Sequence, residues 1–523
     1  MNDSTPGGSP ASGPTFLGHP RGLATLFMTE FFERFTYYGM RALLVLFLVA
    51  ATDGSNPGFG IDRETAGAVY GLYTGAVFLG SLPGGWIADR LLGQRRAVFW
   101  GGVIIAVGNL ILAIPSTPAV FYLGLATIVI GVGLLKPNIS AIVGSLYEGQ
   151  PGARRDAGFS IFYMGINLGA LLAPLVAGTI GEAWNWRGGF FCAGLAMAIG
   201  VVQYKVTEHY LGDAGLAPQG VSDAERRAGW RNVTIGLVVV ALLAVLMFLG
   251  VIPVTVTGLA QAFTTGMIAI GFVFFGYMLL LAKLQPGERG RIAVIAVFFL
   301  CAALFWAGFE QAATTFNLFA QDYTDRSILG GLFPDGVHPA SWYQSANPIF
   351  VVLFAPFFAW VWVALGARNL DPSAPAKFGI ALLLLAGGFV IIMWAAQLVV
   401  SSGGKVAPTW LLLTYLLHTF GELCLSPVGL SNVTKLAPKR YVGQMMGTWF
   451  LGAAVGNSAA GLIGGHVGSS DVGAMPAQFW QMILIGGGAG LLLLALSPVI
   501  RKWTGEGKGG AVAPAARPAR DAT

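Results

Sequence analysis

The sequence predicts an all-α polytopic membrane protein with fourteen transmembrane helices, arranged as two six-helix bundles plus a two-helix linker hairpin. Of its 523 residues, 55% are hydrophobic and only 10% are charged, and the mean hydropathy is +0.70. A soluble domain carries roughly 25% charged residues. The net charge of +6 does not indicate nucleic-acid binding, because the basic residues lie in short runs between apolar stretches, where orientation in a bilayer explains them.

The predicted helices are the apolar runs themselves. About 20 apolar residues span the hydrocarbon core of a bilayer, and Gly, Pro and charged residues interrupt the chain at intervals of this order. Cutting the chain at these interruptions gives fourteen spans, near residues 24–51, 65–89, 95–115, 118–147, 156–180, 188–212, 231–250, 262–285, 292–323, 341–365, 376–398, 406–434, 440–466 and 476–501.

The basic residues of the connections predict the orientation of the chain. One side of the predicted bundle carries Arg90, Arg95, Arg96, Arg154, Arg155, Arg226, Arg227, Lys283, Arg289, Arg291, Arg368, Lys377, Lys435, Lys439 and Arg440. The other side carries only Arg63, Arg187, Arg326 and Lys405. Cytoplasmic loops hold the excess of Lys and Arg, so both termini are predicted to be cytoplasmic.

The distribution of buried charges predicts the domain organisation. Spans seven and eight have no ionisable residue between Arg231 and Lys283, whereas the first six and the last six spans both contain charged groups. We therefore expect an N-terminal six-helix bundle at 24–212, a linker with two extra helices at 213–290 and a C-terminal six-helix bundle at 291–502. Transporters built from two related halves have this form, with the substrate site between the halves near the midplane.

The two ends of the chain differ from the rest in composition. Residues 1–23 are rich in Ser, Pro and Gly and lack the apolar run of a signal peptide. Residues 503–523 have a similar low-complexity character. Both segments are predicted to be disordered and cytoplasmic.

The connection between the second and third spans carries a local signature. Residues 84–96 read Gly-Gly-Trp-Ile-Ala-Asp-Arg-Leu-Leu-Gly-Gln-Arg-Arg. Paired glycines let helices approach closely, and the arginines hold the loop on the cytoplasmic side. The segment resembles the loop signature of the major facilitator superfamily, and this resemblance implies the major facilitator fold.

Three ionisable residues lie together in the first span. Glu30, Glu33 and Arg34 fall within five residues of one another. An ionisable group at membrane depth costs at least ~2.5–3.5 kcal/mol on insertion scales, so such groups indicate function by default. We expect Arg34 to hold Glu33, and Glu30 with it, ionised until protonation or helix movement breaks the contact. The alternative is a static polar network that fastens helices.

Two motifs point to one family. Residues 30–39 contain Glu-x-x-Glu-Arg-Phe-x-Tyr-Tyr-Gly, which resembles the first-helix motif of the proton-dependent oligopeptide transporter (POT/PTR) family. Residues 162–169 are similar to its second signature, Phe-Tyr-x-x-Ile-Asn-x-Gly. The resemblance implies a proton-coupled symporter of a bacterial inner membrane that imports di- and tripeptides. It implies no cofactor, with protons as the coupling ion, and we expect a monomer.

Two pairs of opposite charges are predicted to act as gates. Arg41 and Glu310 each lie about 25 Å along the first helix of their half, at ~1.5 Å per residue, which places both in the outer half of the bilayer. Lys136 and Glu422 lie below the midplane in the fourth helix of each half. Separating a buried pair costs several kcal/mol unless another ion or ligand group takes the vacant place. A dipeptide carries one carboxylate and one ammonium, so it can take that place.

The family resemblance implies further roles. Glu30, Glu33, Arg34 and Glu310 are the predicted proton-coupling residues. The predicted substrate-binding residues are Arg41, Tyr37, Tyr38, Tyr73, Lys136, Asn167, Trp306, Asn347, Glu422, Ser426 and Trp449. Phe78 is an alternative match to the second-helix tyrosine of the family, in place of Tyr73. Each aromatic residue could equally be ordinary core or lipid contact.

Other classes of function remain as alternatives. A membrane-embedded enzyme needs converging catalytic groups, but the five histidines are scattered and the three cysteines have no metal-ligand spacing, so no enzyme and no metal site is predicted. A peptide sensor without transport stays open. The alternative cargo is nitrate or another small anion, which some plant relatives carry, although Lys136 together with Glu422 better suits a zwitterion.

Overall fold

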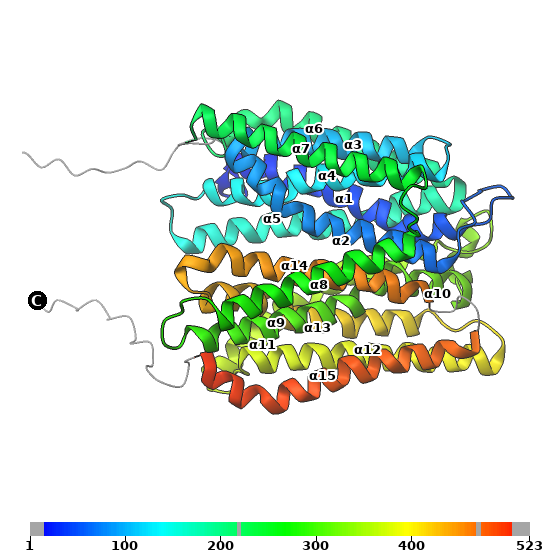
Figure 1. Cartoon of the computed structure of the whole chain (residues 1–523). Helices are drawn as coiled ribbons and strands as arrows, with labels where there is room; N and C mark the ends of the chain where they lie inside the picture. The colour runs from blue at the N-terminus through cyan, green and yellow to red at the C-terminus, as the bar shows by residue number, and fades with distance from the viewer. Residues whose placement is uncertain (1–14, 217–220, 467–471, 505–523) are drawn as a thin grey trace, which may run out of the picture.

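The structure, a computed structural model, describes residues 15–216, 221–466 and 472–504. Within these residues it is built almost entirely of helices that run roughly parallel to one long axis (Figure 1). Its fourteen α-helices of 20 or more residues form two bundles and a hairpin, and α1 begins at the same end of the long axis as α15 ends. We call this end proximal and the opposite end distal.

The elements of the N-terminal half follow in chain order. They are β1 (Thr15–Phe16), β2 (His19–Pro20), α1 (Gly22–Val49), α2 (Arg63–Ile87), η1 (Ala88–Leu92), α3 (Gln94–Ala113), α4 (Pro118–Ser145), α5 (Gly152–Ala173), η2 (Pro174–Gly178), η3 (Ile180–Trp184), α6 (Trp186–Thr207) and η4 (Glu208–Leu211).

The linker hairpin and the C-terminal half complete the chain. The hairpin consists of α7 (Asp223–Phe248) and α8 (Val256–Leu280). The C-terminal half consists of α9 (Glu288–Phe309), η5 (Glu310–Ala313), α10 (Thr315–Tyr323), η6 (Ser327–Leu332), η7 (Ala340–Ser345), α11 (Ala346–Ala367), α12 (Ala374–Ser402), α13 (Thr409–Leu436), η8 (Lys439–Tyr441), α14 (Val442–His466), η9 (Val472–Ala474) and α15 (Met475–Thr504).

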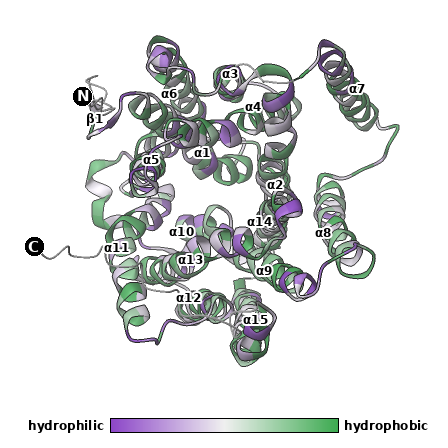
Figure 2. Cartoon of the chain, turned by 90° about the vertical axis from the view of Figure 1, so that its left-hand side faces the viewer, coloured by the Kyte–Doolittle hydropathy of each residue, from purple (hydrophilic) through white to green (hydrophobic). Residues whose placement is uncertain are grey.

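The helices have the length and composition of membrane spans. Twelve helical stretches of the described chain are long and apolar enough to cross a bilayer. The two long helices outside that set are α1, which carries four charged residues, and the glycine-rich α14. Viewed along the bundle, the two halves lie one above the other, and α7 and α8 stand beside them (Figure 2). The predicted pattern of six, two and six helices is therefore present.

The two halves meet most closely along α2 and α14. A Cβ atom added at Gly461 would lie 2.4 Å from the backbone oxygen of Gly67 and from the backbone nitrogen of Gly71. Only glycine allows backbones to approach this closely, as is common between membrane helices. Toward the proximal end the helices separate, since a Cβ added at Gly447 has Leu82 as its nearest neighbour, at 3.9 Å.

The hairpin contacts both halves through α8. Helix α8 packs against α2, α14 and α9, and Thr264 Oγ1 lies 2.7 Å from Ser458 Oγ of α14. Helix α7 contacts mainly the short segment η1, and its apolar side chains, such as Val238 and Val240, are exposed. Only α8 of the hairpin therefore reaches the contact between the halves.

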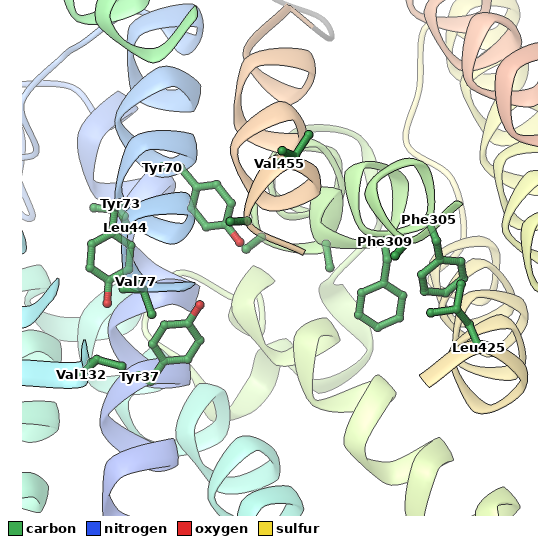
Figure 3. Close-up of a cluster of buried hydrophobic side chains, with 14 of the residues drawn as sticks. Tyr37, Leu44, Tyr70, Tyr73, Val77, Val132, Phe305, Phe309, Leu425 and Val455 are labelled. Atoms are coloured by element: carbon green, nitrogen blue, oxygen red, sulfur yellow. The ribbon is translucent and has the colours of Figure 1, made fainter. Parts of the chain in front are cut away.

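The hydrophobic core is shared by the two halves. Figure 3 shows Tyr37, Tyr70 and Tyr73 of the N-terminal half on one side and Phe305 and Phe309 of the C-terminal half on the other. The buried apolar residues form one continuous cluster across the contact. The core thus holds the halves together as well as the helices within each half.

Two predicted boundaries need correction. Residues 15–23, placed in a disordered lead, form the β1–β2 hairpin and the start of α1. Phe16 packs on Phe27 with ring centroids 5.9 Å apart, and His19 Nδ1 lies 2.8 Å from Tyr147 OH, contacts that local composition does not reveal. Helix α15 also continues to Thr504. The predicted disorder of 1–14 and 505–523 lies outside the described residues.

The ninth predicted span, 292–323, is interrupted. Helix α9 ends at Phe309, the short turn η5 follows, and α10 begins at Thr315. Thr314 between them has φ −117° and ψ −89°, which is outside the helical region. Glu310 is the first residue of this break, so one of the predicted functional carboxylates lies where the backbone changes direction.

Candidate functional site

The charged cluster of α1 is compact and buried. Glu30 and Arg34 are four residues apart and therefore lie on one face of the helix, where Arg34 Nε is 3.2 Å from Glu30 Oε1. Arg34 also pairs with Glu33, with Nη2 donating to Oε1 at 2.6 Å. The three side chains are at most 5% exposed. Within the described chain, Glu30 Oε2 has no hydrogen-bond partner, so this carboxylate is only half satisfied.

Arg41 and Glu310 form the ion pair that the sequence predicts. Arg41 Nη2 lies 2.8 Å from Glu310 Oε2, and each side chain is 7% exposed. Tyr70 OH donates to the same carboxylate oxygen at 3.2 Å. The guanidinium of Arg41 also lies over the ring of Tyr38, 5.4 Å from its centroid. This pair joins α1 to the break after α9, and so joins the two halves.

The second predicted pair is not formed. Among the described residues no ion pair joins Lys136 to Glu422. Lys136 Nζ instead lies 4.4 Å from the centroid of the Phe78 ring. Glu422 Oε2 accepts a hydrogen bond from Asn347 Nδ2 at 2.9 Å. Each charge therefore has a partner within its own half, and the two halves are not connected here.

Lys136 also belongs to the electrostatic surroundings of the α1 cluster. It interacts with Arg34, Glu33 and Glu30 through space. In the other half, Asn347 Nδ2 lies 3.0 Å from Thr419 Oγ1 as well as close to Glu422. The structure thus places Lys136 near the charged residues of α1 in the N-terminal half. Glu422 lies at a separate position in the C-terminal half.

Two predicted polar residues of the substrate site, Asn167 and Ser426, differ in their hydrogen bonding. Asn167 Nδ2 donates to the backbone oxygen of Tyr163, one turn earlier in α5, at 3.0 Å. Tyr163 is 50% exposed and lines a hollow together with Ser140, Phe159 and Ile166, among others. Ser426 Oγ has no hydrogen-bond partner within the described chain.

The predicted aromatic residues are packed to different degrees. Tyr37 and Tyr73 are 5% and 3% exposed and stack with ring centroids 6.4 Å apart, while Tyr38 is half-buried. Trp306 packs on Phe305 and Phe309. Trp449 is 8% exposed, and a Cβ added at Gly429 would lie 2.0 Å from its ring. Trp449 and Tyr73 are therefore core residues in this conformation.

Sequence reasoning missed two contacts between the halves. Arg63, the first residue of α2, pairs with Asp322 of α10. Glu182 of η3 lies 3.8 Å from Arg326 Nη1. The signal was present, because Arg63 and Arg326 are two of the few basic residues predicted on that side. Their partners could not be found because each lies far away in the sequence.

All inter-half ion pairs lie on one side. Within the described residues the ion pairs that join the halves are Arg41–Glu310, Arg63–Asp322 and Glu182–Arg326. Each lies toward the distal end. The backbone approach of α2 to α14 is also closest there, as described above. The two halves are therefore in close contact at the distal end and separate toward the proximal end.

The sequence matches one protein family along most of its length. A sequence model of the POT family matches residues 95–478. The peptide transporter YePEPT of Yersinia enterocolitica subsp. palearctica serotype O:3 (strain YE-P4) is 42% identical over 510 residues, which cover 95% of this chain and 97% of that protein. A di-/tripeptide transporter of Lactococcus lactis subsp. cremoris is 37% identical, with 94% and 98% covered.

A solved structure has the same fold. The crystal structure of the peptide transporter POT in complex with sulfate superposes with a TM-score of 0.86 at 40% identity, over 94% of this chain and 97% of that one. These likenesses confirm the fold class and the family resemblance that the sequence indicated, and they confirm that the chain is a transporter rather than an enzyme.

Proposed function

The chain belongs to the POT family, and we propose that it is a proton-coupled symporter that imports di- and tripeptides by alternating access. The relatives named above are peptide transporters, which supports a peptide cargo. The coupling ion, the gates and the direction of transport form the further part of the proposal.

Opposite charges in separate halves suit a peptide. Lys136 offers a cation in the N-terminal half, and Glu422 offers an anion in the C-terminal half. In this structure neither is neutralised by the other, since Lys136 lies over Phe78 and Glu422 accepts from Asn347. A dipeptide can place its carboxylate at Lys136 and its ammonium at Glu422, and so join the halves. A small anion such as nitrate has no group for Glu422.

One predicted gate is paired and the other is not, and this difference supports alternating access. Arg41 and Glu310 are paired at 2.8 Å, whereas Lys136 and Glu422 are apart. If the proximal end faces the cytoplasm, as the basic loops predict, the described conformation is open to the inside. Closing Lys136 onto Glu422 and separating Arg41 from Glu310 would give the opposite state. Both buried charges of a separated pair need a new partner, and a proton or a peptide group provides it.

Proton coupling is assigned to the carboxylates that touch an arginine. Glu33 and Glu30 contact Arg34, and Glu310 contacts Arg41. Protonation of a carboxylate removes its charge, so the arginine is released and the helices can move. The half-satisfied Glu30, with one oxygen free of partners in the described chain, is in a suitable state to accept a proton.

Uptake of labelled dialanine into liposomes tests the proposal. We expect accumulation only with an inward proton gradient, and competition by other di- and tripeptides. Exchange without accumulation would support a peptide substrate but contradict proton coupling. Labelled nitrate taken up in place of dialanine would indicate an anion transporter, and binding without any uptake would indicate a sensor. Empty liposomes are the control.

The proposed location is the inner membrane of a bacterium, with both termini in the cytoplasm. The basic loops support this orientation, and the named relatives are bacterial proteins. A fluorescent protein fused to the C-terminus is expected to mature and fluoresce in the cytoplasm, whereas alkaline phosphatase fused at the same position is expected to stay inactive.

A further inference from the structure

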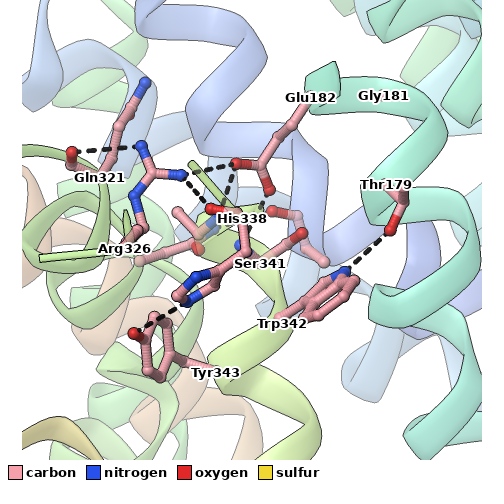
Figure 4. Close-up of polar contacts among 12 residues, drawn as sticks. Thr179, Gly181, Glu182, Gln321, Arg326, His338, Ser341, Trp342 and Tyr343 are labelled. Atoms are coloured by element: carbon pink, nitrogen blue, oxygen red, sulfur yellow. Dashed lines mark hydrogen bonds and ion pairs between the residues drawn. The ribbon is translucent and has the colours of Figure 1, made fainter. Parts of the chain in front are cut away.

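A buried polar cluster around the Glu182–Arg326 pair joins the halves at the distal end, apart from the predicted site residues. It connects η2 and η3 of the N-terminal half with the segment from Arg326 to Tyr343 of the C-terminal half (Figure 4). Its centre is the carboxylate of Glu182, whose side chain is 11% exposed.

In the hydrogen bonds and ion pairs of the described residues, the carboxylate of Glu182 has partners only across the contact between the halves. Its two carboxylate oxygens accept the backbone N–H groups of Ala340 at 2.7 Å and Ser341 at 2.8 Å. These are the first two residues of η7, whose N–H groups have no partner within their own helix. The guanidinium of Arg326 lies 3.8 Å from the same carboxylate. The side chain therefore satisfies donors of the other half.

Arg326 is held in place by its own half. Its Nη1 donates to the backbone oxygen of His338 at 2.6 Å, and its backbone oxygen accepts from His338 N at 3.0 Å. His338 Nε2 in turn lies 3.1 Å from Tyr343 OH. The position that receives Glu182 is thus held by contacts within the C-terminal half.

Further contacts align the same surfaces. Trp342 Nε1 donates to Thr179 Oγ1 at 2.8 Å, and Ser345 Oγ donates to the backbone oxygen of Leu171 at 2.8 Å. A Cβ added at Gly178 would lie 2.3 Å from Ser341 Oγ. The distal end of α5 and η7 therefore fit closely only in the conformation that is closed at this end.

We propose that Glu182 is a gate residue that latches the distal end of the protein through η7. When this end opens, the Glu182 carboxylate must move away from Ala340, Ser341 and Arg326. Their N–H groups then need water as a hydrogen-bond acceptor. Such a latch matters only if the protein works by alternating access, so this role rests on the proposed function. The Arg41–Glu310 pair can break by protonation of Glu310, whereas Glu182 sets how readily the distal end separates.

The distance between the halves tests this role directly. Spin labels on Asp53→Cys and Ser401→Cys report the distal separation, because both positions are exposed and lie at the distal end of opposite halves, Asp53 in the loop after α1 and Ser401 in the last turn of α12. The native cysteines Cys192, Cys301 and Cys424 are replaced first. Pulsed electron double resonance on the labelled full chain in liposomes then gives the short-distance and long-distance populations.

We expect Glu182→Ala to raise the ratio of long to short distances roughly tenfold or more, since hydrogen bonds to a charged group are lost. Glu182→Gln keeps a hydrogen-bond acceptor, so its ratio of long to short distances is expected to lie between those of the parent and Glu182→Ala. Thr179→Val is expected to raise this ratio less than Glu182→Ala does. Glu208→Ala is the matched control, because Glu208 pairs with Lys205 within one half. A Glu182→Ala ratio equal to that of the parent overturns the latch.

Two safeguards keep the result clear. If Glu182→Ala does not give a monodisperse protein, Glu182→Gln and Thr179→Val decide the same question, and unchanged distances in both overturn the latch. Dialanine uptake by the same liposomes is scored separately. A distance shift without uptake supports the latch and argues against peptide transport, whereas uptake without a distance shift supports transport and overturns the latch.

Discussion

At the scale of single residues, the protein keeps ionised groups inside a membrane by giving each a partner. Arg34 contacts two carboxylates, and Arg41 contacts Glu310 and the ring of Tyr38. Among the ion pairs and cation–ring contacts of the described residues, Lys136 has the face of Phe78 as its partner. A cation over an aromatic ring gains about 0.5–2 kcal/mol, less than a buried ion pair with good geometry. This weaker contact is why the proposed function places the carboxylate of a peptide at Lys136.

The first residue-scale prediction concerns Glu33. Glu33→Gln is expected to abolish accumulation of dialanine against a gradient, because the side chain can no longer exchange a proton beside Arg34, while exchange of labelled for unlabelled dialanine persists. The measurement is uptake and counterflow in liposomes. Glu208→Gln, an exposed carboxylate of the same half, is the control and should leave accumulation intact. Uphill uptake by Glu33→Gln at the parent level would remove Glu33 from the coupling.

The second residue-scale prediction concerns Phe78. Replacement by phenylalanines with increasing fluorination weakens the attraction between ring and ammonium while keeping the shape. We expect the apparent affinity for dialanine to rise along the series, by up to about tenfold in all for a contact of ~1 kcal/mol, because Lys136 loses its competing partner. Phe78→Tyr keeps the ring as a control. Affinity that does not follow fluorination would show that Phe78 only fills space.

At the scale of elements, the contact between α2 and α14 depends on small residues. Gly67, Gly71 and Gly461 allow backbone contact at the distal end, and Thr264 of α8 adds a polar contact to Ser458 nearby. Small residues let the backbones of membrane helices approach closely, and the close approach stabilises the contact through van der Waals packing. The hairpin helix α8 thus lies against the contact between the halves.

The element-scale prediction tests this close approach. Gly461→Ala is expected to lower the free energy of unfolding by about 1–3 kcal/mol, because its Cβ would overlap backbone atoms of Gly67 and Gly71. Gly447→Ala on the same helix has room and should be neutral or stabilising, since Ala favours a helix by ~1 kcal/mol over Gly. Thermal unfolding in detergent measures both. Equal effects at the two positions would contradict the distal contact.

At the scale of the whole molecule, three ion pairs close one end, but they do not contribute equally. Arg41 and Glu310 are 7% exposed, whereas Arg63 and Asp322 are 25% and 28% exposed. Removing one member of a buried pair costs about 3–5 kcal/mol because the other charge stays buried. A pair that water reaches contributes only about 0–1 kcal/mol. The inner of these two pairs therefore dominates the distal closure.

This difference gives the whole-molecule prediction. Arg41→Ala should destabilise the folded protein by about 3–5 kcal/mol, and Arg63→Ala by at most about 1 kcal/mol. The double variant Arg41→Ala with Glu310→Gln should recover part of the loss, because no unpaired charge remains. Unfolding in detergent at neutral pH gives these values. If the double variant is no more stable than Arg41→Ala alone, the pair is not the source of the effect.

Most of the architecture could be predicted because it depends on the composition of short stretches of sequence. Apolar runs of about 20 residues have few stable states other than membrane helices. The charges of 30–34 are adjacent in sequence, so their contact follows from helix geometry alone. The break after Phe309 was missed, since no Pro marks it.

The sequence by itself determined the fourteen helices, the division into two halves and the identity of the buried charges, because each depends on hydropathy or on neighbours within a few residues. Only the tertiary structure decided which charges meet. Glu182 and Arg326 are far apart in the chain and belong to different halves, and Lys136 lies over Phe78 rather than near Glu422. These contacts depend on how the two halves are placed relative to each other, and residues far apart in the chain do not encode that placement in local sequence.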